Sequence, residues 1–256
     1  MKHMRPAYAQ HALQATPGGE PVVIIGAGEH AAIAFEHFTY DSPHEVVAFS
    51  AEKDFIQSDH FCGLPVVQLD ALTSVYPPSE YRAFVAASAT QLNLLRRRLY
   101  QTVKDAGYAC VSYVSSNALV WHNVKIGENA CIFEYSTLQH MVRIGNNVTI
   151  WNGVHVGHNS VVEDDCFFAS HVVIAGDCLV GRGSFLGINS CLANDLHLAE
   201  DCVLGAGAVM VRESAPRNVY VGNPARPIGK DSFETFGVTR GRRLPPRRVT
   251  VPWHSG

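Results

Sequence analysis

The segment Ile150-Trp-Asn-Gly-Val-His155-Val-Gly-His158-Asn-Ser160 lies inside a repeat of six residues, and this repeat decides the fold. Every sixth residue from Val114 to Met210 is apolar, and no insertion interrupts the series. The residue four places later is small or β-branched in every six except one, where Leu196 stands. An amphipathic helix repeats at 3.6 residues and a strand at two, so neither fits this spacing. A chain that turns a corner every six residues does fit, which predicts a parallel β-helix.

Glycine often occupies the second place of a six. We attribute these glycines to bends of the backbone, since glycine adopts conformations that other residues avoid. The glycines in question are Gly127, Gly145, Gly157, Gly181, Gly187 and Gly205.

Composition excludes several classes of protein. A hydrophobic content of 47% in 256 residues is ample for a core, and a net charge of −3 argues against nucleic acid or an anionic membrane as the main partner. The apolar runs are too short to span a bilayer, and residues 1–20 lack the apolar core of a signal peptide. The seven cysteines include no Cys-x-x-Cys spacing, so we expect neither a disulfide framework nor a metal cluster. We therefore expect a cytoplasmic protein.

The N-terminal half begins like a nucleotide-binding unit. Residues 21–25 have the composition of a buried strand, Gly26-Ala-Gly28-Glu29-His30-Ala31 follows as a glycine turn, and a helical pattern continues after it. Strand, glycine turn and helix together present backbone N–H groups to an anion. Ala31 stands where a third glycine would be, and Ser50 ends the next strand where a dinucleotide site has an acidic residue. These departures disfavour NAD.

A second helix is predicted from Thr90 to Ala106. It carries apolar residues on one face and Arg96, Arg97 and Arg98 beside them. We expect the arginines to be solvated, with a phosphate contact as the alternative.

The repeat and the glycine turn together resemble the hexapeptide-repeat sugar acyltransferases, in particular the sialic-acid O-acetyltransferase and bacillosamine N-acetyltransferase group. The resemblance implies a small Rossmann-like α/β domain followed by a left-handed parallel β-helix with three sixes per coil. Residues eighteen apart then stack in columns about 4.8 Å apart. The expected organisation is a flexible arm (1–20), a Rossmann-like nucleotide-sugar-binding domain (21–106), a β-helical acyltransferase domain (107–230) and an irregular C-terminal arm (231–256) that packs on a neighbouring subunit.

The resemblance also indicates the catalytic residues. Residues 151–160 are similar to the family pattern Asn-x-Gly-x-x-x-x-His-(Asp/Glu), which makes His158 the general base. Asn159 stands where the family has the acidic residue that orients the base. Gly176 lies one coil further on, where its backbone N–H would stabilise the oxyanion. Asp177, stacked above Asn159, is a candidate for the missing carboxylate.

Binding residues follow from the same resemblance. The segment from Val219 to Pro227 resembles the family's terminal loop along coenzyme A, and the cofactor contacts it implies are Gly176, Asn194, Gly205, Gly222 and Arg226. Arginine suits a phosphate, although a solvent-facing cap is the alternative reading of Arg226. The implied substrate contacts are Gly26, Gly28, Glu29 and His30 on the nucleotide side and Glu134 and His155 on the acceptor side.

Three histidines share one predicted column: His122, His140 and His158. Stacked side chains point the same way and do not converge on one ion, and no carboxylates accompany them. We therefore expect no metal, although a β-helical carbonic anhydrase is the enzyme class that such a column would otherwise suggest.

These observations predict an enzyme that transfers an acetyl group from acetyl-CoA to the amine of a nucleotide-linked amino sugar. Transfer to a sugar hydroxyl, as on a sialic acid, transfer of a longer acyl group, and a non-catalytic nucleotide-sugar-binding protein remain open. The family's trimers bind coenzyme A between adjacent helices, so we expect a homotrimer. We also expect its contacts to bury Trp151, Phe167 and Phe185, which the repeat places on outer faces.

Overall fold

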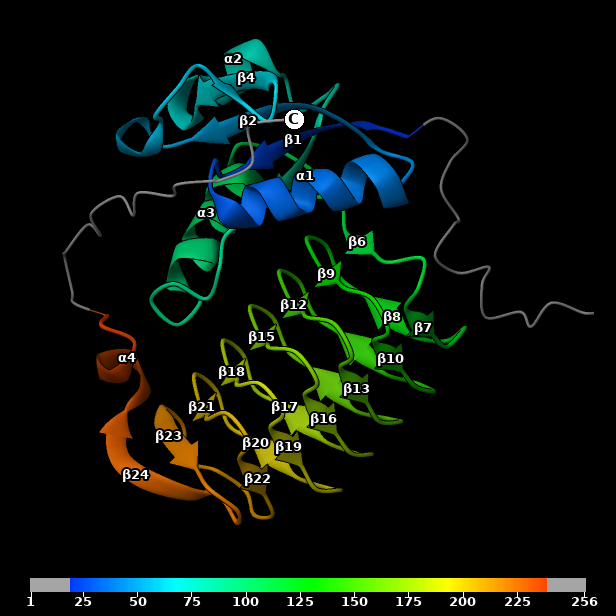
Figure 1. The fold of residues 1–256 in the computed structure, drawn as a ribbon, viewed down its shortest axis with the longest axis vertical. Helices are drawn as coiled ribbons and strands as arrows, with labels where there is room; N and C mark the ends of the chain where they lie inside the picture. The colour runs from blue at the N-terminus through cyan, green and yellow to red at the C-terminus, as the bar shows by residue number, and fades with distance from the viewer. Residues whose placement is uncertain (1–18, 239–256) are drawn as a thin grey trace, which may run out of the picture.

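The computed structural model describes residues 19–238, which form an α/β domain followed by a β-helix (Figure 1). The sheet of the α/β domain has the strand order β3-β4-β2-β1-β5. Its strands are β1 (Pro21–Ile25), β2 (Glu45–Ala51), β3 (His60–Phe61), β4 (Leu64–Gln68) and β5 (Arg82–Val85). Strand β3 is antiparallel to β4, and the other pairs are parallel.

Helices cover both sides of this sheet. They are α1 (Glu29–Asp41), α2 (Leu72–Val75) and α3 (Leu94–Asp105). Val22 and Ile24 of β1 share a core cluster with Phe38 of α1, whereas Val23 and Ile25 share one with residues of α2 and α3. This alternation follows from the strand geometry, in which successive side chains point to opposite faces. No helix in the range 19–238 is long and apolar enough to cross a membrane.

Helix α3 begins later than the sequence predicts. Gln91, Leu92 and Asn93 have φ values of 54°, 50° and 65°, which lie in the left-handed region and cannot continue a helix. Asn93 is fully buried, and its side-chain Nδ2 donates a hydrogen bond to the carbonyl of Gly183 at 3.0 Å. The loop before α3 is therefore fixed against the β-helix.

The β-helix is a three-sided prism, and each side is a sheet of parallel strands, as the repeat predicts. The first face contains β6 (Tyr113–Val114), β9 (Cys131–Ile132), β12 (Thr149–Ile150), β15 (Phe167–Phe168), β18 (Phe185–Leu186), β21 (Val203–Leu204) and β23 (Asn218–Val221), and β24 (Arg226–Asp231) joins its end. The second face contains β7 (Leu119–Val120), β10 (Thr137–Leu138), β13 (His155–Val156), β16 (Val173–Ile174), β19 (Cys191–Leu192) and β22 (Val209–Met210). The third face contains β8 (Lys125–Ile126), β11 (Arg143–Ile144), β14 (Val161–Val162), β17 (Leu179–Val180) and β20 (His197–Leu198).

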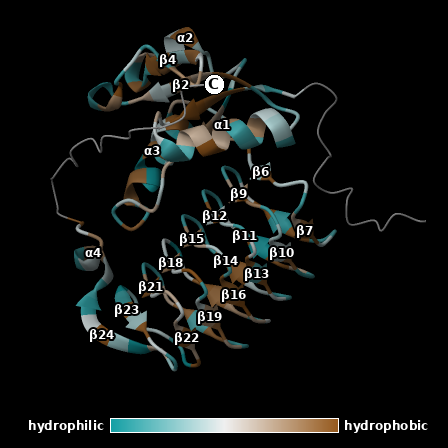
Figure 2. Ribbon diagram, in the orientation of Figure 1, coloured by the Kyte–Doolittle hydropathy of each residue, from teal (hydrophilic) through white to brown (hydrophobic). Residues whose placement is uncertain are grey.

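The coils stack in the register that the repeat predicts. Thr137 pairs with His155, and His155 pairs with Val173, so one coil is eighteen residues. The first residue of nearly every six is buried in one continuous core, and Figure 2 shows hydrophobic colour recurring at β13, β16 and β19.

The corners lie at the fourth residue of the six, not at the second. Asn147, Asn159, Asp165 and Asp177 all have φ between 56° and 63° there, because Asn and Asp tolerate the left-handed region. Glycine in the second place has another reason. A Cβ on Gly157 would lie 2.5 Å from the carbonyl carbon of Ala175 in the next coil, so these glycines permit close stacking and our interpretation of them as bends was wrong.

Arginines of α3 fix the α/β domain on the β-helix. Arg96 is 1% exposed, contacts the hydroxyl of Thr149, and donates to the carbonyl of Cys166 at 2.8 Å. Arg97 pairs with Asp165 at 2.9 Å. Arg98 instead pairs with Glu52 and is half exposed. The expected solvated helix face was therefore wrong for Arg96 and Arg97, whose charges join the two parts of the chain.

The described end of the chain folds back along the first face. Strand β24 is antiparallel to β23, and the short helix α4 (Ser232–Thr235) follows it. Asp231 caps α4 by accepting hydrogen bonds from the N–H groups of Phe233 and Glu234. Residues 231–238 thus contact their own chain. The remainder of the expected C-terminal arm, and most of the N-terminal arm, lie outside the described residues.

Candidate active site

His158 lies on the turn between β13 and β14, at the edge of the prism where the second and third faces meet. Its backbone N–H donates to Oε1 of Gln139 at 3.0 Å. Its imidazole is about half exposed, at 49%. This edge is opposite the first face, on which the α/β domain sits.

The imidazole of His158 lies directly over Gly176 in the next coil. A Cβ on Gly176 would lie 2.4 Å from Cε1 and 2.7 Å from Nε2 of His158, so only glycine leaves room for the ring. Within residues 19–238, the N–H of Gly176 has no hydrogen-bond acceptor. An imidazole and an unpaired backbone N–H therefore lie at one corner. A general base and an oxyanion donor are the two groups that acyl transfer requires.

A carboxylate completes this cluster. Oδ2 of Asp177 is 3.5 Å from Nδ1 of His158, and Oδ1 of Asp177 accepts a hydrogen bond from Nδ2 of Asn159 at 2.9 Å. Nδ2 of Asn159 is also 3.5 Å from Nδ1 of His158. The cluster of His158, Asn159, Gly176 and Asp177 is named the corner cluster below.

The other histidines of the column lie further along the same edge. Nδ1 of His140 is 3.0 Å from Nδ2 of Asn123, an amide and not a metal ligand of the usual kind. No group of three or more His, Cys, Asp or Glu residues between 19 and 238 is placed to hold a metal ion. His155 is partly buried on the second face, and this burial lowers its pKa.

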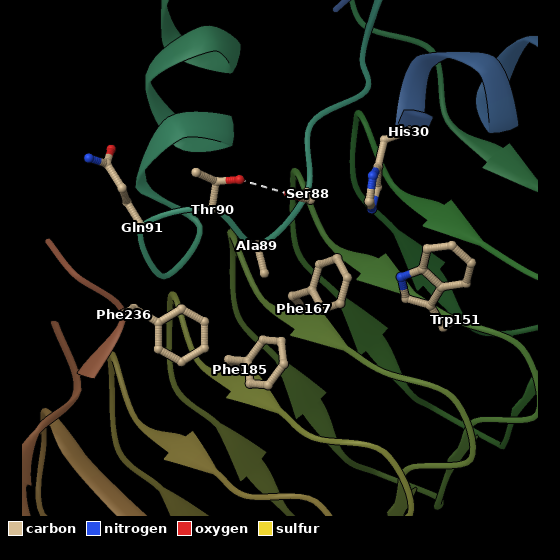
Figure 3. A pocket seen from close by; sticks show the side chains of 9 residues that line it. All are labelled: His30, Ser88, Ala89, Thr90, Gln91, Trp151, Phe167, Phe185 and Phe236. Atoms are coloured by element: carbon tan, nitrogen blue, oxygen red, sulfur yellow. Dashed lines mark hydrogen bonds between the residues drawn. The ribbon is translucent and has the colours of Figure 1, made fainter. Parts of the chain in front are cut away.

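An open groove of about 540 Å³ lies where the α/β domain meets the first face (Figure 3). The lining residues come from α1, the loop after β5, the first face and the segment after α4. They are His30, Ser88, Ala89, Thr90, Gln91, Trp151, Phe167, Phe185 and Phe236. This set is named the aromatic groove. Sequence reasoning missed the loop residues and Phe236, because no local pattern shows that these distant segments meet.

The three aromatic residues of the first face pack against other rings of their own chain. Trp151 stacks on Phe133, with ring centroids 4.6 Å apart, and meets His30 of α1 edge-on at 5.8 Å. Phe185 stacks on Phe167 and also contacts Phe236 at 5.1 Å. The α/β domain and the C-terminal segment therefore bury Phe167 and partly bury the other two aromatic residues, and the expectation that subunit contacts bury them stays a prediction.

The glycine turn ends beside this groove. Gly26 has a φ of 132°, and a Cβ there would lie 2.8 Å from the carbonyl oxygen of Ala86, so no other residue fits well. Gly28 caps α1, and nothing lies within 4 Å of a Cβ built on it. Burial lowers the pKa of His30, an effect that Glu29 opposes and Arg96 reinforces, so His30 is neutral at neutral pH.

Glu134 has a partner that the sequence did not indicate. Its Oε1 is 2.7 Å from Nε2 of His37 on α1. The carboxylate thus contacts the α/β domain at the corner between the first and second faces.

The residues expected to bind the cofactor lie along the last coils. Asn194 is exposed on the same edge as His158, one coil beyond Gly176. A Cβ on Gly205 would lie 2.9 Å from Val221. Gly222 has a φ of 91° and precedes a cis peptide bond between Asn223 and Pro224. Arg226 is exposed, and its guanidinium donates to the carbonyl of Ala225 at 3.0 Å.

Comparison with known proteins agrees with this architecture. Residues 141–176 match the bacterial transferase hexapeptide family (six repeats), and this range contains the corner cluster except Asp177. No curated protein sequence matches the chain significantly.

Several solved structures share the fold over most of the chain. A variant of perosamine N-acetyltransferase from Caulobacter crescentus, in complex with CoA and GDP-perosamine, is 27% identical over 84% of this chain and 99% of its own, with a TM-score of 0.74. The acetyltransferase domain of PglB from Neisseria gonorrhoeae, in complex with acetyl coenzyme A, is 21% identical over 82% of this chain and 100% of its own, with a TM-score of 0.73. WeeI from Acinetobacter baumannii is 20% identical with the same coverage and a TM-score of 0.69, and these last two show the fold alone.

Residues 141–176 thus carry the hexapeptide repeats of bacterial transferases, and the two-part fold is similar to that of perosamine N-acetyltransferase. It is therefore an enzyme that transfers an acyl group, as its sequence predicts.

Proposed function

We propose that this enzyme transfers the acetyl group of acetyl-CoA to the amine of a nucleotide-linked amino sugar. The observation that carries the proposal is the corner cluster, in which His158 lies over Gly176 within a fold shared with perosamine N-acetyltransferase. The β-helix is left-handed and the α/β domain Rossmann-like in this proposal, since the mostly parallel sheet and the three-faced prism both suit that architecture.

His158 is the general base. The carboxylate of Asp177 faces Nδ1, so the imidazole holds its proton on Nδ1 and presents the lone pair of Nε2. The sugar amine attacks the thioester carbonyl, a C–N bond forms, and Nε2 takes the proton that the amine loses. When the C–S bond breaks, that proton passes to the departing thiolate and gives free CoA thiol. The N–H of Gly176 stabilises the oxyanion between these steps.

The nucleotide binds at the end of β1. Strand order reverses between β1 and β5, because β2 and β4 continue on one side of β1 while β5 lies on the other. Ligands of open parallel sheets bind at such a point, beyond the carboxyl ends of the strands. Gly26, Gly28 and Glu29 form the turn there, whose N–H groups suit a diphosphate.

The aromatic groove continues from this point and holds part of the bound nucleotide sugar. Its rings offer apolar faces, and the hydroxyls of Ser88 and Thr90 and the amide of Gln91 offer hydrogen bonds. His30 belongs to both the turn and the groove, and His155 and Glu134 extend the acceptor side in this proposal.

One copy of the chain cannot complete the site. The aromatic groove lies on the first face, whereas His158 lies on the opposite edge of the same prism. A sugar held in the groove of one subunit must therefore react at His158 of another copy. This separation supports the homotrimer, in which acetyl-CoA lies between adjacent helices along Asn194, Gly205, Gly222 and Arg226, with the guanidinium near a phosphate.

The choice of an amine acceptor depends mainly on the similarity to perosamine N-acetyltransferase. An amine requires less activation than a hydroxyl, so the absence of an acidic residue directly after His158 would by itself favour an amine. Asp177 supplies a carboxylate beside His158, which weakens that argument. Transfer to a hydroxyl would use the same base and the same oxyanion donor as transfer to an amine, so a direct test must distinguish the two acceptors.

Thiol release tests the proposal. The purified protein is incubated with acetyl-CoA and one acceptor at a time: GDP-perosamine, other nucleotide-linked amino sugars, their hydroxyl counterparts, and sialic acid. Free thiol with an amino sugar and not with its hydroxyl counterpart is the expected result. Thiol release with hydroxyl acceptors alone would make the enzyme an O-acetyltransferase. Thiol release only with a longer acyl-CoA would show that the donor is not acetyl-CoA.

A further inference from the structure

The base of this enzyme lacks the neighbour that the family pattern provides. Asn159 occupies the place where an acidic residue directly follows the histidine. An amide can fix the orientation of an imidazole, but it carries no charge to stabilise the imidazolium that forms when the base takes a proton. The corner cluster must supply that charge from elsewhere if His158 is to act as a general base.

Asp177 is held in the required place by the β-helix itself. It lies eighteen residues after Asn159, so it stacks on Asn159 in the next coil. Its φ of 58° places it at a left-handed corner, and its backbone N–H donates to the carbonyl of His158 at 2.9 Å. The main chain of Asp177 is therefore bound to the main chain of the histidine that its side chain approaches.

The two oxygens of Asp177 have different partners. Oδ1 accepts a hydrogen bond from Nδ2 of Asn159 at 2.9 Å, whereas Oδ2 is 3.5 Å from Nδ1 of His158. Asn159 thus restrains the carboxylate and directs the second oxygen at the imidazole. The distance to Nδ1 is longer than in a formed hydrogen bond, and such bonds in a free enzyme are often long and shorten when substrates bind.

We propose that Asp177 replaces the family's acidic residue as the positioning residue of His158, with Asn159 as the bridge that holds it. The carboxylate keeps the proton of the neutral imidazole on Nδ1, leaves Nε2 free to accept a proton, and stabilises the imidazolium that results. The expected effects on kcat rest on the proposed function. The expected position of the proton on the imidazole does not depend on it.

Kinetics of three variants test the role. Asp177→Asn should lower kcat about tenfold or more and leave KM for both substrates nearly unchanged, because the amide keeps the shape and loses the charge. The double variant Asn159→Asp/Asp177→Asn returns a carboxylate to the family position and should recover most of the lost kcat. Asp195→Asn is the matched control, since Asp195 lies at the same corner one coil further on, with a φ of 56°, and should behave as the wild type.

A spectroscopic readout separates this inference from the proposed function. Nitrogen NMR of histidine-labelled protein, assigned with His158→Gln, reports which ring nitrogen of His158 carries the proton. The wild type should show the Nδ1–H tautomer, and Asp177→Asn should lose that preference while Asp195→Asn keeps it. An unchanged tautomer and an unchanged kcat in Asp177→Asn would each overturn the proposal. A changed tautomer in a protein that releases no thiol would support Asp177 and contradict the proposed reaction.

Discussion

His37 on α1 contacts Glu134 on the β-helix, with Nε2 and Oε1 separated by 2.7 Å, and its other ring nitrogen is 2.8 Å from the carbonyl oxygen of Ile33. Both partners of the imidazole are hydrogen-bond acceptors, so the ring satisfies both only when it carries two protons. The pair is shielded on one side by Tyr113 and Phe133, whose rings contact His37 edge-on. It is a hydrogen-bonded contact between the two parts of the chain.

Breaking this contact should weaken the attachment of the α/β domain. Glu134→Gln weakens the hydrogen bond to His37 and should lower the free energy of unfolding by about 1 kcal/mol, the net contribution of a typical intramolecular hydrogen bond. Urea denaturation measures the change. Glu213→Gln, an exposed carboxylate on the same β-helix, serves as the control and should stay within about 0.5 kcal/mol of the wild type. Equal stability of both variants would show that the pair contributes nothing.

Arg96 should matter far more. It is fully buried and donates to Thr149 and to carbonyl groups of the β-helix, and burial lowers its pKa to about 10, so it remains charged at pH 7. Arg96→Met leaves these acceptors without a donor and should cost about 3 kcal/mol of unfolding free energy. Arg98→Met lies on the same helix with a half-exposed side chain, and its effect should not exceed about 1 kcal/mol. Similar losses in the two variants would contradict a special role for Arg96.

His158→Ala should reduce turnover at least about a hundredfold if the imidazole is the general base. The matched control is His197→Ala, an exposed histidine on the third face, which should retain full activity. Thiol release at saturating acetyl-CoA measures both. Turnover within tenfold of the wild type would exclude His158 as the base, whereas an equal loss in the control would indicate damage to the fold.

Gly176→Ala tests the close approach of the ring. The added methyl would lie 2.4 Å from Cε1 of His158, so the imidazole must move away from Gly176. We expect turnover to fall about tenfold or more, because a displaced base no longer faces the thioester. The melting temperature should change little, since His158 is on the surface and can rotate outward. Full activity in this variant would contradict the arrangement.

Phe236→Ala tests the aromatic groove. Loss of the ring that packs on Phe185 should raise KM for the nucleotide sugar severalfold and leave KM for acetyl-CoA unchanged, because Phe236 lines the groove and is not among the residues proposed to contact the cofactor. Ile228→Ala is the control, since Ile228 belongs to β24 of the same C-terminal segment and does not line the groove. A rise in KM for acetyl-CoA, or none for either substrate, would be inconsistent with an acceptor groove at this place.

The period of six predicted most of the β-helix, because each coil depends only on residues close in sequence and eighteen apart. Once the coil length is known, the proximity of His158, Gly176 and Asp177 follows from arithmetic. The reason for the second-place glycines was misjudged, since the same residue type serves both left-handed corners and close stacking. Only φ and the distance to the next coil distinguish these two uses.

Contacts between distant segments could not be predicted in this way. Arg96 and Arg97 have the appearance of solvated residues, and nothing in the sequence of α3 shows that Asp165 lies opposite. Phe236 follows α4 at the far end of the chain, yet it lines a groove with His30 from the beginning of α1. These contacts depend on how the α/β domain and the C-terminal segment pack against the β-helix, and no periodic pattern in the sequence predicts that packing.

The eighteen-residue coil also limits how this enzyme can change in length. Removal of six residues between His158 and Gly176 would keep the first residue of every six inside the prism and the fourth residue of every six at a corner. It would nevertheless shift all later residues by one face, so that Gly176 and Asp177 would lie at a different edge from His158. Removal of a whole coil after Asp177 would shorten the molecule and leave the corner cluster intact. Length differences among functional relatives should therefore be multiples of eighteen in this region, although multiples of six would satisfy the core.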